Sequence, residues 1–133
     1  MSITRVTELL ESVLSEFPSI QLAILFGSVS RGSANAESDI DVAIQADGNL
    51  TLQNRIAIIE AIALAFNRPV DLVDLRTAGQ PLLHQIVSTG KLVIGTRNQW
   101  GDLIYRNIME NEDFVPYQQR ILEGRRYSWI NNS

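Results

Sequence analysis

Apolar and polar residues recur along the chain with two different periods. An apolar residue every third or fourth position predicts helices, over 4–17, 51–66 and 80–89. Short apolar or alternating runs predict strands, over 20–26, 39–46, 70–75 and 91–95. Because helices and strands interleave, the pattern predicts an α/β (α+β) fold: a small mixed sheet with helices packed mainly on one face and a helical C-terminal extension.

The helix expected over 51–66 carries enough apolar residues for a core-facing stripe. We expect that stripe to consist of Leu52, Ile56, Ile59, Ile62, Ala63 and Phe66. In the strand expected over 39–46, side chains should alternate between the two faces of the sheet. Asp39 and Asp41 then lie on the same face, one pleat apart.

Residues after 98 have a different character, because both tryptophans and all three tyrosines fall between Trp100 and the C-terminus. The apolar spacing predicts one helix around Trp100–Met109 and a second one that contains Phe114, Tyr117, Ile121 and Leu122. Aromatic residues, methionine and arginine are enriched at protein interfaces. We therefore expect one domain over 1–133, with a core over 1–95 and a tail over 96–133 that either packs on the sheet or meets a partner.

Composition excludes several classes of protein. With no cysteine, the 133-residue chain has neither disulfides nor a thiolate zinc site, which fits a cytoplasmic location. No apolar run reaches the roughly 18 residues of a membrane span, and the N-terminus does not resemble a signal peptide. The net charge is −4, with Lys91 as the single lysine, so long nucleic acid is not an expected partner.

Candidate chemistry is concentrated between Phe26 and Val42. Gly27 and Ser28 open a glycine-rich loop whose backbone amides can approach a phosphate. Two ionised carboxylates such as Asp39 and Asp41, roughly 4 Å apart at an effective dielectric near 20, repel by about 4 kcal/mol. A divalent cation relieves that repulsion, and Mg²⁺ prefers carboxylate and phosphate oxygens. Alone, an Asp-x-Asp pair is usually a solvated strand face and a Gly-Ser pair is usually a turn.

Together, Gly27-Ser28, ten intervening residues and Asp39-Ile40-Asp41 resemble the signature of the DNA polymerase β-like nucleotidyltransferases. The form with Arg31-Gly32 in the loop is similar to the minimal members of that superfamily. The resemblance implies transfer of a nucleoside monophosphate from an NTP such as ATP, with two Mg²⁺ ions. Gly27 and Ser28 would hold phosphates, and Arg31 would contact a phosphate. Ser30 stands where alanine is common in the family, a departure that we do not expect to affect the chemistry.

A third carboxylate is expected on the strand that follows the second long helix. Asp71 and Asp74 are both present there, but three residues apart on a strand they point to opposite faces. By resemblance, Asp71 is the third metal ligand, beside Asp39 and Asp41, and helps to activate the acceptor hydroxyl. Asp74 is expected to cap the next turn or helix.

Small stand-alone members of the superfamily resemble antitoxins that pair with a HEPN-domain RNase toxin. That resemblance implies that the chain joins a HEPN toxin in a heteromeric complex and transfers AMP from ATP to a tyrosine of the toxin. Two alternatives stay open at this point. One is a binding module that neutralises its partner by occlusion without catalysis, and the other is a nucleotidyltransferase that modifies a small molecule such as an antibiotic.

Overall fold

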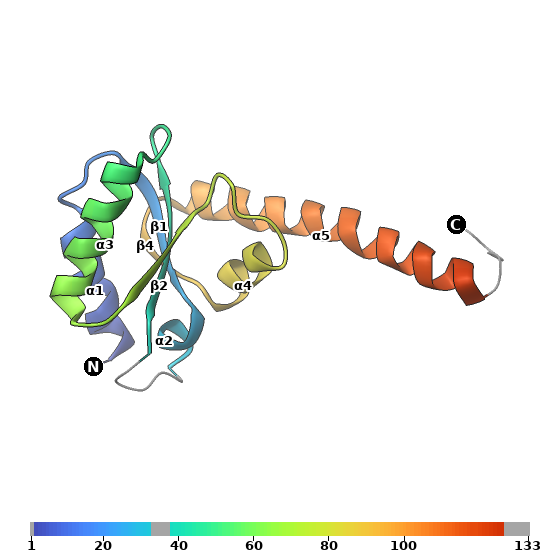
Figure 1. Cartoon of the computed structure of the whole chain (residues 1–133), viewed down its shortest axis with the longest axis horizontal. Helices are drawn as coiled ribbons and strands as arrows, with labels where there is room; N and C mark the ends of the chain where they lie inside the picture. The colour runs from blue at the N-terminus through green and yellow to red at the C-terminus, as the bar shows by residue number, and fades with distance from the viewer. Residues whose placement is uncertain (1, 33–37, 127–133) are drawn as a thin grey trace.

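The computed structural model describes residues 2–32 and 38–126, with side chains as far as residue 111. Tyr127 and Trp129 of the aromatic tail lie outside the described residues. Helices and strands interleave as the periodicity predicts (Figure 1). In chain order the elements are α1 (Ile3–Leu14), β1 (Ile20–Phe26), α2 (Gly27–Arg31), β2 (Ile40–Ala46), α3 (Leu52–Phe66), β3 (Val70–Asp74), α4 (Leu82–Thr89), β4 (Lys91–Ile94) and α5 (Arg97–Arg126).

A four-stranded mixed sheet forms the centre of the protein, with strand order β3-β2-β1-β4. β1 runs antiparallel to both β2 and β4, whereas β2 and β3 run parallel. The parallel pair requires a crossover connection, and α3 supplies it. The predicted mixed α/β fold is therefore confirmed.

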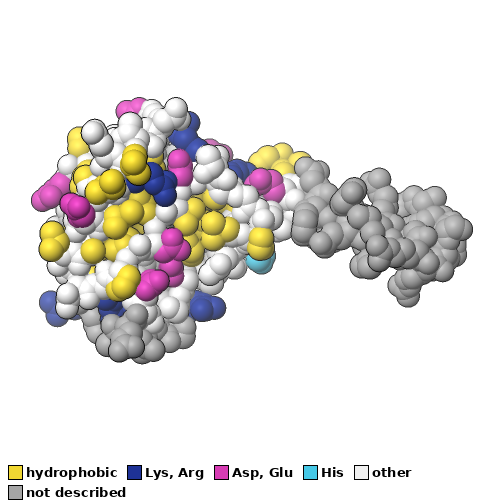
Figure 2. All heavy atoms as spheres, in the orientation of Figure 1, with side chains coloured by type: hydrophobic (Ala, Val, Ile, Leu, Met, Phe, Trp, Pro, Cys, Tyr) yellow, Lys and Arg dark blue, Asp and Glu magenta, His cyan; other side chains and the backbone are white. Residues whose placement is uncertain are grey.

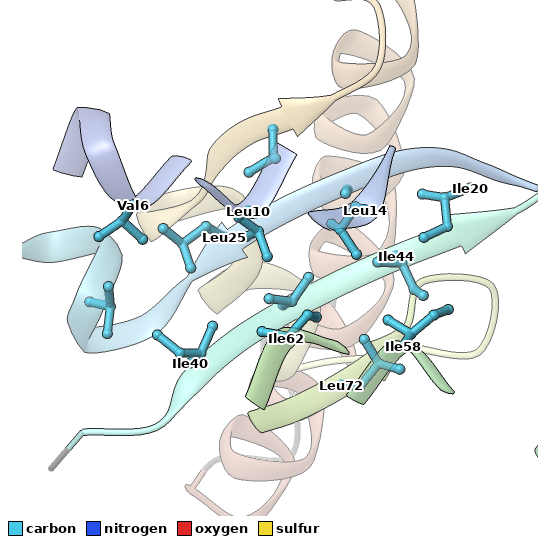
Figure 3. Packing of buried hydrophobic residues seen from close by; sticks show 14 residues of the cluster. Val6, Leu10, Leu14, Ile20, Leu25, Ile40, Ile44, Ile58, Ile62 and Leu72 are labelled. Carbon is cyan, nitrogen blue, oxygen red and sulfur yellow. The ribbon is translucent and has the colours of Figure 1, made fainter. Parts of the chain in front are cut away.

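One face of the sheet is covered by the two long helices α1 and α3, which lie together on one side in Figure 1. Ile40, Val42 and Ile44 of β2 point into this layer and are completely buried. Leu10 and Leu14 of α1 meet them from the helix side, as Figure 3 shows. The alternation of β2 is as predicted, and this apolar layer is the larger of the two cores.

The other face is covered only in part, by α4 and by the first turns of α5. Ala43 of β2, Leu83 and Ile86 of α4, and Leu103 of α5 belong to this second core. Asp41 lies on the same face as Ala43, one pleat beyond the apolar contact. The partial cover leaves one end of this face to polar side chains.

Two predicted details of the helices are wrong. α1 ends at Leu14, three residues before the end expected at residue 17, and the backbone amide of Ser15 caps its last turn. α3 buries Ile58 and Ile62, whereas Leu52 and Ile56, expected in the buried stripe, are 72% and 47% exposed. The stripe was misplaced because α3 has apolar residues around most of its circumference, so spacing alone does not select one face.

The tail forms one helix, α5, and not the two that were expected. The four residues 110–113 include no glycine or proline, so nothing there ends the helix. The start of α5 is tied to the loop after β3, because the guanidinium of Arg106 donates to the carbonyl oxygens of Leu75 and Ala78. Beyond these contacts α5 extends away from the sheet (Figure 1).

Candidate active site

The candidate site lies where β1 passes into α2. Gly27 has a φ of +78°, a left-handed conformation that strongly favours glycine. A Cβ atom placed at this position would overlap the Oδ2 atom of Asp41. Backbone conformation and available space therefore both require glycine here, and the result is a turn that passes directly against the Asp41 carboxylate.

Asp41 is flanked by residues of two neighbouring strands. In the antiparallel pairing its Cα partner is Phe26 of β1, and in the parallel pairing its partner is Asp71 of β3. Residues paired across adjacent strands project from the same face of a sheet. Asp71 therefore joins Asp41 on the partly covered face, as the resemblance implied. Asp39 directly precedes β2 and is exposed.

The electrostatics of the site centre on Asp41. Burial raises the pKa of the Asp41 carboxyl, and the negative charges of Asp71 and then Asp39 raise it further. Such a group favours a proton or a cation over its bare ionised form. The charges of Asp71 and Asp39 thus both act on Asp41, whereas Asp74 is not among the causes of its shift. Asp74 instead accepts a hydrogen bond of 3.0 Å from the Arg76 amide in the following turn, the capping role predicted for it.

A divalent cation is the group that this donor set would fit. Asp39, Asp41 and Asp71 offer only carboxylate oxygens, which hard ions such as Mg²⁺ prefer. Burial, and then the charges of Asp71 and Asp39, raise the pKa of Asp41, so a cation between these carboxylates would relieve their repulsion. Within the described ranges, however, no three His, Cys, Asp or Glu side chains already converge around one point as metal ligands. The fit is one of chemistry and neighbourhood rather than of a preformed cage.

The remaining predicted residues lie on the short turn of α2. Ser28 is half-buried directly after Gly27. Arg31 is exposed at the last position of α2. Their contacts with phosphate stay predictions.

The motif pointed to no partner for this turn, but the structure reveals one at the end of α4. The amide of Gly27 donates to the Oγ1 atom of Thr89 at 3.1 Å, and the hydroxyl of Ser30 donates to the Thr89 carbonyl oxygen. Thr89 lies 62 residues after Gly27 and belongs to no recognisable motif. The one available signal was Ser30 itself, a hydroxyl at a position where alanine is common.

Sheet topology, the glycine turn and the acidic strand ends together define a nucleotidyltransferase site. A model of the family described as polymerase beta, nucleotidyltransferase matches residues 8–99. The chain belongs to this family.

Within this family, the chain is similar to adenylyltransferases and to chains of toxin–antitoxin structures. The protein adenylyltransferase MntA of Shewanella oneidensis is 38% identical over 90 residues, which span 68% of this chain and 65% of the relative. A crystal structure of a toxin–antitoxin with AMP-PNP has a chain that is 31% identical with a TM-score of 0.77, and the match covers 91% of this chain and 98% of that one. A structure of a tri-AMPylated Shewanella oneidensis HEPN toxin in complex with MNT antitoxin matches at 30% identity and a TM-score of 0.69, covering 91% and 99%.

Proposed function

We propose that this chain is an antitoxin that transfers AMP from ATP to a tyrosine of a HEPN-type partner toxin and thereby silences it. The observation that carries the proposal is the placement of Asp41 against the Gly27 turn and beside Asp71, where burial, and then the charges of Asp71 and Asp39, raise the pKa of Asp41. The similarity to MntA and to chains of toxin–antitoxin crystal structures supports the choice of acceptor.

In this proposal the phenolic oxygen of the acceptor forms a bond to the α-phosphorus of ATP. The bond from that phosphorus to the oxygen bridging to the β-phosphate breaks, and pyrophosphate leaves. Asp71 receives the phenolic proton, while Ser28 and Arg31 orient the phosphates. Mg²⁺ held by Asp39, Asp41 and Asp71, with two ions expected, would neutralise charge on the attacking and leaving oxygens.

We further propose that residues 1–95 form the catalytic core and that the tail, residues 96–133, provides the surface that binds the partner toxin. Tyr105, Ile108 and Met109 lie three and four residues apart on α5 and are 65%, 49% and 41% exposed. Figure 2 shows hydrophobic side chains gathered where α5 leaves the body. An apolar stripe of this kind fits the apolar face of a partner helix.

The tail proposal predicts that Ile108→Glu weakens binding of the HEPN partner by at least about tenfold, the scale of an interface hot spot. Leu64→Glu is the matched control, because Leu64 of α3 is a helical apolar residue with 85% exposure that lies outside the tail. Titration calorimetry with the purified partner measures both affinities. Equal losses in the two variants, or no loss in Ile108→Glu, would place the partner surface elsewhere.

Intact mass spectrometry of the partner tests the proposed activity. The protein encoded beside this gene is incubated with the chain, ATP and Mg²⁺, with the double variant Asp39→Asn/Asp41→Asn as control. A gain of one or more AMP units with the wild type alone is expected. Tight binding without any gain would instead favour an occluding module, and turnover with a free small acceptor in the absence of partner would favour a small-molecule enzyme.

The location follows from the proposed reaction. A HEPN RNase that needs silencing acts on cellular RNA, and ATP is supplied in the same compartment, so we propose that the chain works in the cytoplasm. In the part of the chain that the structure describes, no helix is both long and apolar enough to cross a membrane.

A further inference from the structure

Thr89, the last residue of α4, is bonded to the two ends of the turn that carries the nucleotidyltransferase motif. Its Oγ1 atom accepts the Gly27 amide at 3.1 Å and donates to the Gln85 carbonyl oxygen at 2.8 Å. Its carbonyl oxygen accepts the hydroxyl of Ser30, which is only 5% exposed. The hydrogen bond that the Thr89 hydroxyl donates to Gln85 within α4 fixes its orientation, and the oxygen remains able to accept the Gly27 amide.

These bonds change the role that the motif suggests for Gly27. The amide of Gly27 points at α4, and its hydrogen is already engaged by Thr89. The missing side chain of Gly27 makes room for the Asp41 carboxylate on the other side. Gly27 is thus hydrogen-bonded to α4 and packed against the Asp41 carboxylate. We therefore expect the residues that follow Gly27 in the turn to contact the phosphates.

We propose that Thr89 is a positioning residue for nucleotide binding, with Ser30 as its second attachment to the turn. The inference rests on the proposed function, since it concerns the same nucleotide site. Two hydrogen bonds, one before and one after Ser28 in sequence, hold the turn in a single conformation. A turn that is already ordered loses less conformational freedom when phosphates bind, so affinity for the nucleotide depends on both bonds.

Three variants separate positioning from simple structural support. Thr89→Val keeps the shape of the side chain but leaves the Gly27 amide without its acceptor, whereas Thr89→Ser keeps the hydroxyl. Ser88→Ala is the matched control, because the Ser88 hydroxyl donates to the His84 carbonyl oxygen at 2.7 Å within the same helix and is not bonded to α2. Thermal unfolding of each variant reports the stability of the fold.

Fluorescence titration with a mant-labelled ATP and Mg²⁺ is the primary measurement, because it needs no partner. Thr89→Val is expected to raise Kd about five- to tenfold, the effect of one lost hydrogen bond, and to raise KM for ATP more than it lowers kcat for AMP transfer. Thr89→Ser and Ser88→Ala are expected to bind within about twofold of the wild type. Wild-type affinity in Thr89→Val, with or without a lower Tm, would overturn the proposal.

Ser30→Ala decides the question if Thr89→Val does not fold. It removes the second bond while introducing a residue common in the family, and a two- to threefold weaker Kd is expected, part of the effect of one hydrogen bond. Unchanged binding in Ser30→Ala would then overturn the inference. Failure of the proposed function is distinguishable from this outcome: the wild type would bind the nucleotide and still transfer no AMP to the HEPN partner.

Discussion

The two faces of β2 illustrate opposite uses of one strand. Toward α1 and α3 it presents Ile40, Val42 and Ile44, all completely buried. Toward α4 and α5 it presents Asp41 at one end and Gln45 at the other, with only Ala43 in the second core between them. Gln45 lines a cavity of about 130 Å³ between the sheet and α5. The fully covered face supplies stability, and the partial cover of the other face leaves room for polar chemistry.

The largest expected effect is on catalysis, from a substitution on the polar face of β2. Asp41→Asn removes a carboxylate placed between the glycine turn and Asp71, so AMP transfer should fall by about a thousandfold, equivalent to several kcal/mol of lost charge stabilisation. The fold should persist, because the amide keeps the shape of the side chain. A radiolabelled AMP-transfer assay with circular dichroism as control measures both. A variant that retains most of its activity would remove Asp41 from the mechanism.

The apolar face should respond in the opposite way. Ile44→Ala, at a completely buried position, should lower the free energy of unfolding by about 2–5 kcal/mol because it leaves a cavity in a close-packed core. Leu64→Ala, at an apolar position that is 85% exposed, should change stability by no more than about 0.5 kcal/mol. Urea denaturation monitored by tryptophan fluorescence compares the two. Similar losses in both variants would contradict the assignment of the two environments.

Gly27→Ala tests the contact between the turn and the carboxylate face. A φ of +78° and the overlap with Asp41 together should cost about 1–3 kcal/mol and displace Asp41 or the turn. Gly32→Ala is a useful control, because Gly32 has a similar φ of +76° with no atom within 4 Å of the added carbon. AMP transfer should fall much further in Gly27→Ala than in Gly32→Ala. Equal activity would mean that strain, and not contact with Asp41, governs this position.

The smallest expected effect is on the pH dependence of stability. Burial and the charges of Asp71 and Asp39 raise the pKa of Asp41 in the folded protein, so the folded state binds a proton more tightly than the unfolded chain. Stability should therefore decline as the pH rises from about 4 through the raised pKa. Relative to wild type, Asp41→Asn should gain less than about 1 kcal/mol over this range, because Asp41 is partly solvent-screened. Denaturant unfolding between pH 4 and 7 measures the difference, and an opposite slope would contradict the assigned cause.

The pattern of apolar and polar residues predicts the structure correctly in segments where a single periodicity dominates. The strict alternation in β2 placed Asp41 and Ala43 on one face and Ile44 on the other, as the structure confirms. Asp71 was assigned to the carboxylate set by resemblance, and the parallel register with Asp41 agrees. The face on which each side chain of β2 lies can be predicted from the sequence, because neighbouring side chains of a strand point to opposite faces.

The same pattern does not predict the structure in segments where one periodicity is compatible with several helix faces or helix boundaries. α3 is apolar on more than one side, and only the packed sheet selects Ile58 and Ile62 over Leu52. The tail was divided into two helices because its apolar residues form two groups, although nothing between the groups ends a helix. Helical periodicity describes a possible face and does not say which neighbour will cover it.

The sequence by itself determined the fold class, the alternation of β2 and the residues of the nucleotidyltransferase motif, because each depends on neighbours a few positions apart. Only the tertiary structure decided which side of α3 is buried, that Gly27 makes room for Asp41, and that Thr89 reaches the motif from 62 residues away. Those features depend on the pairing of β1 with β2 and the packing of α4 against α2, contacts between segments that no local pattern relates.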